Sequence, residues 1–161
     1  MNAVAGIAIA LGKALSPQFK GYAAQVITNA AALARALIEG GARLVTGGTE
    51  NHMMVVDTVS SFGIDGTVAE GALDRAGITV NKQIIPDDPK PPLRPSGIRL
   101  GTPAATTRGM SESDMQKLAE WIVAALQRAA DAQFLDSLRL EVESFCARFP
   151  VPGIAAGAEA H

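Results

Sequence analysis

The segment Ser96-Gly97-Ile98-Arg99-Leu100-Gly101-Thr102-Pro103 places one arginine in a short apolar stretch bounded by glycines and a proline. Apolar runs between such turn residues are typical of short strands, so residues 98–101 are predicted to form one. A guanidinium within a buried strand needs a partner, because burying it unpaired costs several kcal/mol. Arg99 is therefore expected to have a specific partner.

Two kinds of partner are open to Arg99 on the residues alone. One is a structural ion pair with Asp57, Asp87 or Asp88. The other is the carboxylate or phosphate of a ligand, which the planar guanidinium can bind with two parallel hydrogen bonds. Nothing in the segment decides between them. Arg94 and Arg108 lie in turns instead, where we expect both to be solvated.

The rest of the chain predicts a small sheet covered by helices. Apolar spacing, a Ser16-Pro17 helix start and Gly40-Gly41 as a stop predict the helices, at residues 3–15, 17–39, 67–76, 112–129 and 131–148. Apolar runs between turn residues predict the strands, at residues 43–46, 52–57, 78–80 and 98–101. This order indicates an α/β fold with a small layer of strands.

Two local features refine that prediction. The apolar run at residues 53–56 lacks alternation, so this strand is expected to be covered on both faces. Thr67 and Glu70 have the spacing of a capping box, which predicts that a helix begins there.

Composition excludes several classes of partner. The chain has 161 residues and a formal net charge of -2, so no electrostatic case exists for nucleic acid or an anionic membrane. It contains no apolar run of about 18 residues, the length of a membrane helix. Cys146 is the single cysteine, which excludes an intrachain disulfide and fits the cytoplasm. Its helical setting indicates a small core residue.

Familiar catalytic motifs are missing from the sequence. Neither Gly40-Gly41 nor Gly47-Gly48 continues into a phosphate-binding loop. His52 is the single histidine before the chain end, so metal binding is not expected there and none is predicted elsewhere. Lys82 lies between predicted strands and is read as an exposed or salt-bridged lysine rather than a reactive amine.

Three motifs then make the sequence specific, because they resemble serine hydroxymethyltransferase in the order and spacing of that family. They are Leu44-Val45-Thr46-Gly47-Gly48-Thr49-Glu50-Asn51-His52, Ala76-Gly77-Ile78-Thr79-Val80-Asn81-Lys82, and Ser96 to Ala104 with Thr107-Arg108-Gly109 following. The resemblance runs from about residue 3 to residue 150 and covers the C-terminal two-fifths of such an enzyme.

The resemblance implies a function for the complete enzyme and a role for this part. The family uses pyridoxal phosphate to transfer a hydroxymethyl unit between serine and tetrahydrofolate, leaving glycine. Arg99 matches the arginine that binds the amino-acid carboxylate. Gln83 stands where many members have a folate-contacting asparagine. The family's Thr-Thr-Thr-His motif and its Schiff-base lysine are absent, so no covalently bound cofactor and no catalytic residue are expected on this chain.

The same resemblance sets the expected organisation and partners. Residues 1–20 are predicted to form a helical connector and residues 153–161 a flexible tail. Residues 21–152 are predicted to form a small α/β domain with a mostly antiparallel sheet covered by helices, like the C-terminal domain of fold-type I pyridoxal-phosphate enzymes. The chain is expected to form a homo-oligomer, such as a dimer, or to pair with the missing N-terminal region. A non-catalytic assembly module and part of a 2-methylserine hydroxymethyltransferase are the alternatives.

Overall fold

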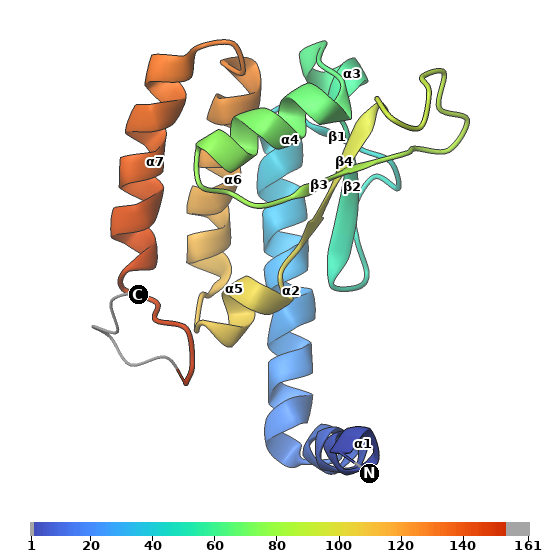
Figure 1. Ribbon diagram of the computed structural model, residues 1–161, viewed down its shortest axis with the longest axis vertical. Coiled ribbons are helices and arrows are strands. Elements are labelled where there is room, and N and C mark those ends of the chain that lie inside the picture. Colours follow the sequence, from blue (N-terminus) through green and yellow to red (C-terminus); the bar gives the residue numbers. More distant parts are fainter. Residues whose placement is uncertain (1, 154–161) are drawn as a thin grey trace.

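The structure, a computed structural model, describes residues 2–153 and shows a helical layer packed on a small sheet (Figure 1). The helices are α1 (Asn2–Ala14), α2 (Pro17–Glu39), α3 (Thr58–Phe62), α4 (Gly66–Arg75), α5 (Pro103–Thr107), α6 (Glu112–Gln127) and α7 (Ala132–Cys146). The strands are β1 (Arg43–Leu44), β2 (Met53–Asp57), β3 (Asn81–Gln83) and β4 (Gly97–Gly101). The predicted α/β class is confirmed. Of the predicted tail, residues 154–161 lie outside the described residues.

The helix ends show why most helices were predictable. The Ser16 side chain caps α2 by accepting the Phe19 amide at 3.2 Å, and Pro17 occupies the first turn. Asp131 caps α7 in the same way, accepting the amide of Phe134 at 3.0 Å. Each capping oxygen satisfies a backbone donor that the helix itself leaves unpaired. The short helices α3 and α5 were not predicted.

The capping box expected at Thr67 is wrong. The Asp65 carboxylate caps α4 instead, accepting the Thr67 and Val68 amides at 3.1 and 3.0 Å, so the helix begins at Gly66. Glu70 is left free to bind the next strand rather than the helix start. Asp65, two residues before Thr67, thus caps the helix in place of the predicted Thr67–Glu70 pair.

All neighbouring strands run antiparallel, in the order β1-β2-β4-β3. The segment at residues 96–103 contains β4, which lies in the interior of the sheet between β2 and β3. The edge strand was predicted at residues 78–80 but lies at Asn81–Gln83. Ile78 is buried in the core directly after the left-handed Gly77, so pairing with β4 begins three residues later.

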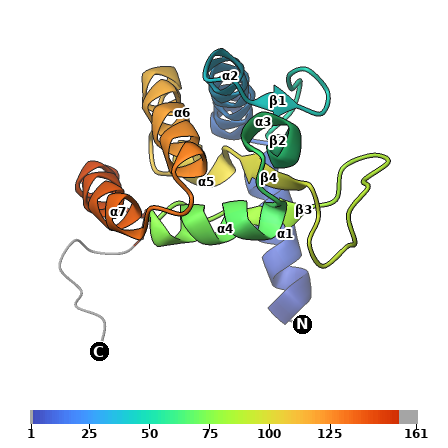
Figure 2. The ribbon, with the colours of Figure 1, turned by 90° about the horizontal axis from the view of Figure 1, so that it is seen from above.

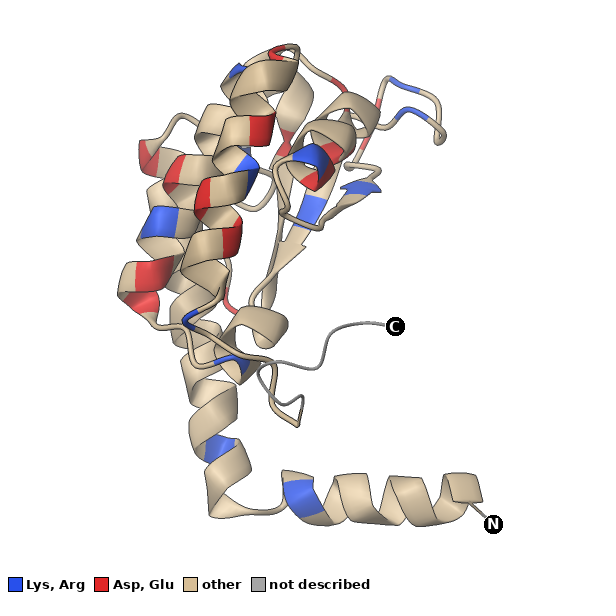
Figure 3. Ribbon diagram, turned by 60° about the vertical axis from the view of Figure 1, so that its left-hand side comes forward, with Lys and Arg blue, Asp and Glu red and all other residues tan. Residues whose placement is uncertain are grey.

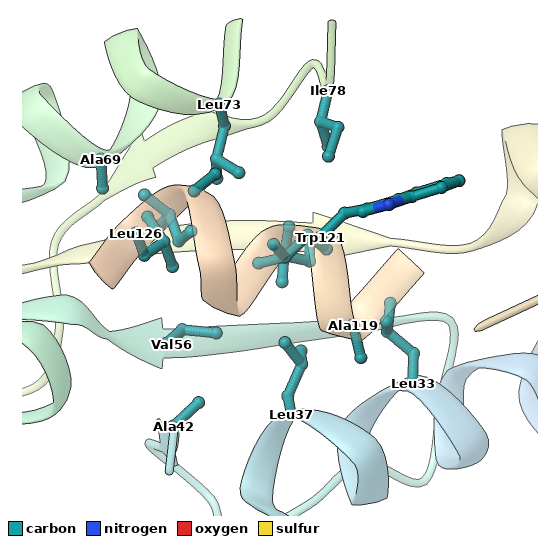
Figure 4. Packing of buried hydrophobic residues seen from close by; sticks show 14 of the residues in the cluster. Leu33, Leu37, Ala42, Val56, Ala69, Leu73, Ile78, Ala119, Trp121 and Leu126 are labelled. Carbon is teal, nitrogen blue, oxygen red and sulfur yellow. The ribbon is translucent and has the colours of Figure 1, made fainter. Parts of the chain in front are cut away.

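The two faces of the sheet differ sharply. Met54, Val56, Ile98 and Leu100 are buried on one face, where α2 and α4 contact the strands. Figure 4 shows Leu37, Leu126 and Val56, from α2, α6 and β2, gathered in that core. The view from above places the helical layer on one side (Figure 2). The prediction that residues 53–56 are covered on both faces is therefore wrong, because burial alternates along β2.

Buried polar side chains fasten α2 to the segment after β4. Asn29 is fully buried and donates to the Thr106 hydroxyl and the Met110 carbonyl, each at 2.9 Å. The Thr102 hydroxyl donates to the Val26 carbonyl at 2.9 Å. Because buried polar groups are stable only when paired, these bonds fix where α5 lies relative to α2.

Helix α1 projects from the foot of α2 and buries none of its residues (Figure 3). Its large apolar side chains are 60–65% exposed; they are Val4, Ile7, Ile9 and Leu11. Among the described residues, no helix combines the length and apolar character needed to span a bilayer.

Candidate functional site

The pairing of β4 with its neighbours places three side chains in one row on the uncovered face of the sheet. Arg99 lies opposite Val55 of β2 and opposite Asn81 of β3. Directly paired residues in a sheet point to the same face. Since Ile98 and Leu100 point into the core, Arg99 must point away from it.

Arg99 is consequently exposed, and the expectation of a buried guanidinium is wrong. Its Nε atom donates to the Oδ1 atom of Asn81 at 3.0 Å. Within the described residues no carboxylate lies within ion-pair distance of the guanidinium. Among the described residues, no acid therefore compensates the positive charge of the guanidinium, and its terminal nitrogens can donate to another partner.

The three aspartates that were possible structural partners of Arg99 have other contacts or positions. Asp57 lies 3.5 Å from the Arg43 guanidinium and caps α3 through the Ser60 amide. Asp88 binds the Ser96 hydroxyl and amide, and Asp87 occupies a turn with a left-handed backbone. In the part of the chain that the structure describes, Arg99 therefore forms no ion pair with Asp57, Asp87 or Asp88.

Arg99 opens onto a hollow of about 450 Å³. The residues that line it are His52, Met53, Thr79, Val80, Asn81, Arg99, Leu100 and Gly101. This lining contains neither Asp nor Glu, so Arg99 gives the hollow a positive potential. A small anion is the ligand that such a hollow suits. In the described part of the chain, His, Cys, Asp and Glu form no cluster able to hold a metal ion.

Gln83 lies on the same face as Arg99, two residues after Asn81 on the edge strand. Its side-chain amide donates to the Ile84 carbonyl at 3.1 Å. Ile84 and Pro86 then line a neighbouring hollow of about 670 Å³, opposite the 45–51 loop. The structure thus brings Gln83 and Arg99 to one open surface, with a mainly apolar recess beside Gln83.

Lys82 points to the opposite face of β3 and lies 3.6 Å from the Glu70 carboxylate. This contact confirms the salt-bridged interpretation of Lys82. Cys146 is half-buried against the core, as predicted. Arg94 is exposed as predicted, and its guanidinium also binds Asp65 at 2.8 Å. The prediction that Arg108 is solvated is wrong, because its guanidinium donates to the Phe149 and Cys146 carbonyls at 2.6 and 2.8 Å.

Two aspartates hold the loop that precedes β4. Asp88 accepts hydrogen bonds from the amides of Ile85, Lys90 and Ser96 and from the Ser96 hydroxyl. Burial acts to raise the pKa of Asp88, but these bonds outweigh it and lower the pKa to about 2. The Val68 amide, aided by Arg94 against the opposing effect of burial, lowers the pKa of Asp65.

Asn81 is the site residue that the sequence reasoning missed. Asn81 belongs to the motif at residues 76–82, but no role was predicted for it. Alternation offered a signal, because Asn81 and Gln83 share a face of any strand that contains both. Its contact with Arg99 depends on the register between β3 and β4, which local sequence does not encode.

Comparisons with known proteins identify the family of the chain. The family model described as serine hydroxymethyltransferase matches residues 1–122. The chain is similar to a serine hydroxymethyltransferase of Acidobacterium capsulatum, with 48% identity over 95% of this chain and 36% of the relative. It is also similar to those of Halorhodospira halophila (46%, covering 95% and 36%) and Koribacter versatilis (44%, covering 94% and 35%). The chain spans about a third of the length of these curated relatives.

Proposed function

The chain belongs to the serine hydroxymethyltransferase family, and on this premise we propose that it supplies the amino-acid carboxylate site of such an enzyme. The complete enzyme would transfer a hydroxymethyl unit between serine and tetrahydrofolate. In this proposal Arg99 binds the carboxylate of serine or glycine. The other groups of the site come from a larger part of the enzyme.

One observation carries the proposal: an exposed arginine with no acidic partner among the described residues, at a hollow without acids. A guanidinium that bound a structural carboxylate would have its charge already compensated. Arg99 instead presents terminal N–H donors to solvent, in the planar arrangement that matches a carboxylate. Binding there would orient the substrate and leave its amino and hydroxymethyl groups for the rest of the enzyme.

The described residues do not fit a covalently bound pyridoxal phosphate. No lysine lines the hollow at Arg99, and Lys82 points to the other face toward Glu70. Pyridoxal phosphate, when bound to the complete enzyme, supplies the electron sink for bond cleavage. We therefore assign no chemical step to this chain and restrict its role to binding and orientation.

Gln83 is the proposed contact to the folate ring. It shares the open face with Arg99, and the recess beyond it is lined by Ile84 and Pro86. An amide next to a recess that combines apolar side chains with polar ones, such as Thr49, Glu50 and Asn51, suits a flat heterocycle that has polar edges.

The partner in this proposal covers α1. A helix that is apolar on every side and buries nothing requires a neighbour, since water does not stabilise such a surface. The missing part of the enzyme, or a second copy of the chain, would cover Val4, Ile7, Ile9 and Leu11. For this assembly we propose a location in the cytoplasm.

Co-expression tests the function. The chain is produced together with the part of the Acidobacterium capsulatum enzyme that it does not match. We expect a stable complex that converts serine to glycine when pyridoxal phosphate and tetrahydrofolate are added. Arg99→Lys keeps the charge but loses the forked donor, and should lower kcat/KM by about a hundredfold. A complex whose activity ignores Arg99→Lys would contradict the proposal.

A second candidate is a non-catalytic assembly module, which the exposed helix α1 favours. It predicts a stable complex with the longer partner but no serine cleavage that depends on this chain. Absorbance separates a further possibility: a stable lysine-linked chromophore on the pure chain, together with serine cleavage, would overturn both candidates.

A further inference from the structure

The hydrogen bond between Arg99 and Asn81 decides which edge of the guanidinium is free. A guanidinium can bind a carboxylate through its Nε side or through its two terminal nitrogens, and its donors are rigidly arranged in one plane. Asn81 already accepts the Nε hydrogen at 3.0 Å. The Nε side is therefore occupied before any ligand arrives, and the terminal edge is left.

The orientation of the Asn81 amide is fixed independently of Arg99. Its Nδ2 atom donates to the carbonyl oxygen of Lys82 at 2.9 Å. An amide turned the other way would place an acceptor against that carbonyl and a donor against the guanidinium. Both contacts would then be repulsive, so the Lys82 carbonyl holds Oδ1 toward Arg99.

The rest of the cross-strand row offers Arg99 no substitute. Its neighbour on the other side, Val55, is apolar. Gly101, the next residue on the same face of β4, has no side chain. Among the described residues Asn81 is thus the side chain that hydrogen-bonds Arg99. A neutral acceptor at this position directs the guanidinium and leaves its charge uncompensated. An aspartate there would compensate that charge.

We propose that Asn81 is the positioning residue for the carboxylate-binding arginine: by holding Nε of Arg99, it turns the terminal nitrogens toward the hollow and enforces end-on binding of the carboxylate. This inference deepens and rests on the proposed function. Asn81 does not touch the reacting atoms. It acts through Arg99, and its neutrality leaves the full charge of Arg99 available to the ligand.

The test combines nuclear magnetic resonance of the labelled chain with two variants of Asn81. The Arg99 Nε–H signal is assigned from its loss in Arg99→Lys. In Asn81→Ala we expect hydrogen exchange at Nε to accelerate by about fivefold, the equivalent of one ordinary hydrogen bond. Asn81→Asp retains an acceptor and should keep the slow exchange. Lys82→Ala, on the other face of the same strand, is the matched control and should leave exchange unchanged.

Glycine binding is the second readout. Asn81→Ala should weaken it about two- to tenfold, because Arg99 then samples other orientations. Asn81→Asp should weaken it at least as much despite slow exchange, since its charge competes with the glycine carboxylate. Lys82→Ala should bind glycine like the unmodified chain.

The outcomes separate this inference from the function on which it rests. Unchanged Nε exchange in Asn81→Ala would overturn the inference. So would unchanged glycine affinity in that variant while Arg99→Lys loses binding. Wild-type affinity in Arg99→Lys, or no effect of glycine on the unmodified chain, would instead count against the proposed function; the exchange measurement then still decides whether Asn81 holds Arg99. If Asn81→Ala fails to fold, Asn81→Asp decides through its combination of slow exchange and weak binding.

Discussion

Replacing Asn29 with alanine should be among the most damaging single changes to this fold. The side chain is fully buried and makes three hydrogen bonds: it donates to Thr106 and Met110 at 2.9 Å each, and accepts from Gln25 at 3.0 Å. Asn29→Ala removes both donors and leaves the Met110 carbonyl without its partner. A buried acceptor without a partner costs about 1–3 kcal/mol, so the loss in unfolding free energy should total about 2–4 kcal/mol.

Urea unfolding, followed by tryptophan fluorescence, measures that loss. Trp121 lies buried in α6 and reports on the core. Gln25→Ala is the matched control, because it removes a bond to the same Asn29 side chain from a half-buried position and should cost less than about 1 kcal/mol. The double variant of Asn29→Ala with Thr106→Val should cost less than the sum of the single variants, since the two residues share a bond.

The reasoning would be refuted if Asn29→Ala cost no more than Gln25→Ala. Fully additive effects of Asn29→Ala and Thr106→Val would likewise contradict the shared bond. The first result would mean that apolar packing, rather than the hydrogen bonds of Asn29, determines how α5 lies against α2. The second would mean that Asn29 and Thr106 stabilise the fold independently of each other.

Three further predictions concern the loop before the site, the packing of α4 and the exposed helix. Asp88 has an ordinary pKa of 3.8 that the fold lowers to about 2, so its stabilising effect is present above 3.8 and is lost as the pH falls toward 2. Asp88→Asn should flatten this part of the pH dependence of the urea midpoint, and an unchanged slope would count against the hydrogen-bonded loop. Gly66→Ala should lower the free energy of unfolding by about 1–3 kcal/mol, because its Cβ would meet the backbone oxygens of Gly97 and Pro95. Gly71→Ala, on the exposed side of the same helix, should raise it by up to about 1 kcal/mol. Equal urea midpoints for the two variants would contradict this prediction. Ile7→Glu should leave unfolding unchanged and weaken self-association or partner binding by about tenfold or more, as judged by light scattering, and a chain that is monomeric at high concentration before the change would argue against an interface at α1.

Most helices and the approximate positions of the strands could be predicted from local sequence, but not which strands pair. Ser16-Pro17 and Asp131 mark helix starts because the groups that cap a helix lie within three residues of each other. The start of α4 was misplaced, since Thr67 and Asp65 are both good caps and local sequence does not rank them. Burial of Ile78 moved the edge strand to Asn81, a tertiary effect that strand propensity does not contain.

Only part of the candidate site could be predicted from the sequence. Arg99 was the predicted carboxylate ligand and stays a prediction, but its surroundings were misjudged because the glycines and apolar neighbours of β4 suggested burial on every side. The alternation of Ile98, Arg99 and Leu100 gives the correct answer once one face of the sheet is known to be open. Asn81 became a site residue only through the register with β4, which arises from pairing between segments 18 residues apart.

The central claim is that Arg99 binds a carboxylate, and it is tested most directly by titrating the labelled chain with glycine and with glycinamide. The two ligands differ only in the carboxylate. The account predicts that glycine shifts the signals of the terminal Arg99 nitrogens, that glycinamide does not, and that the glycine response of the rest of the hollow disappears in Arg99→Lys. Equal responses to the two ligands, or a glycine response that survives in Arg99→Lys, would contradict it.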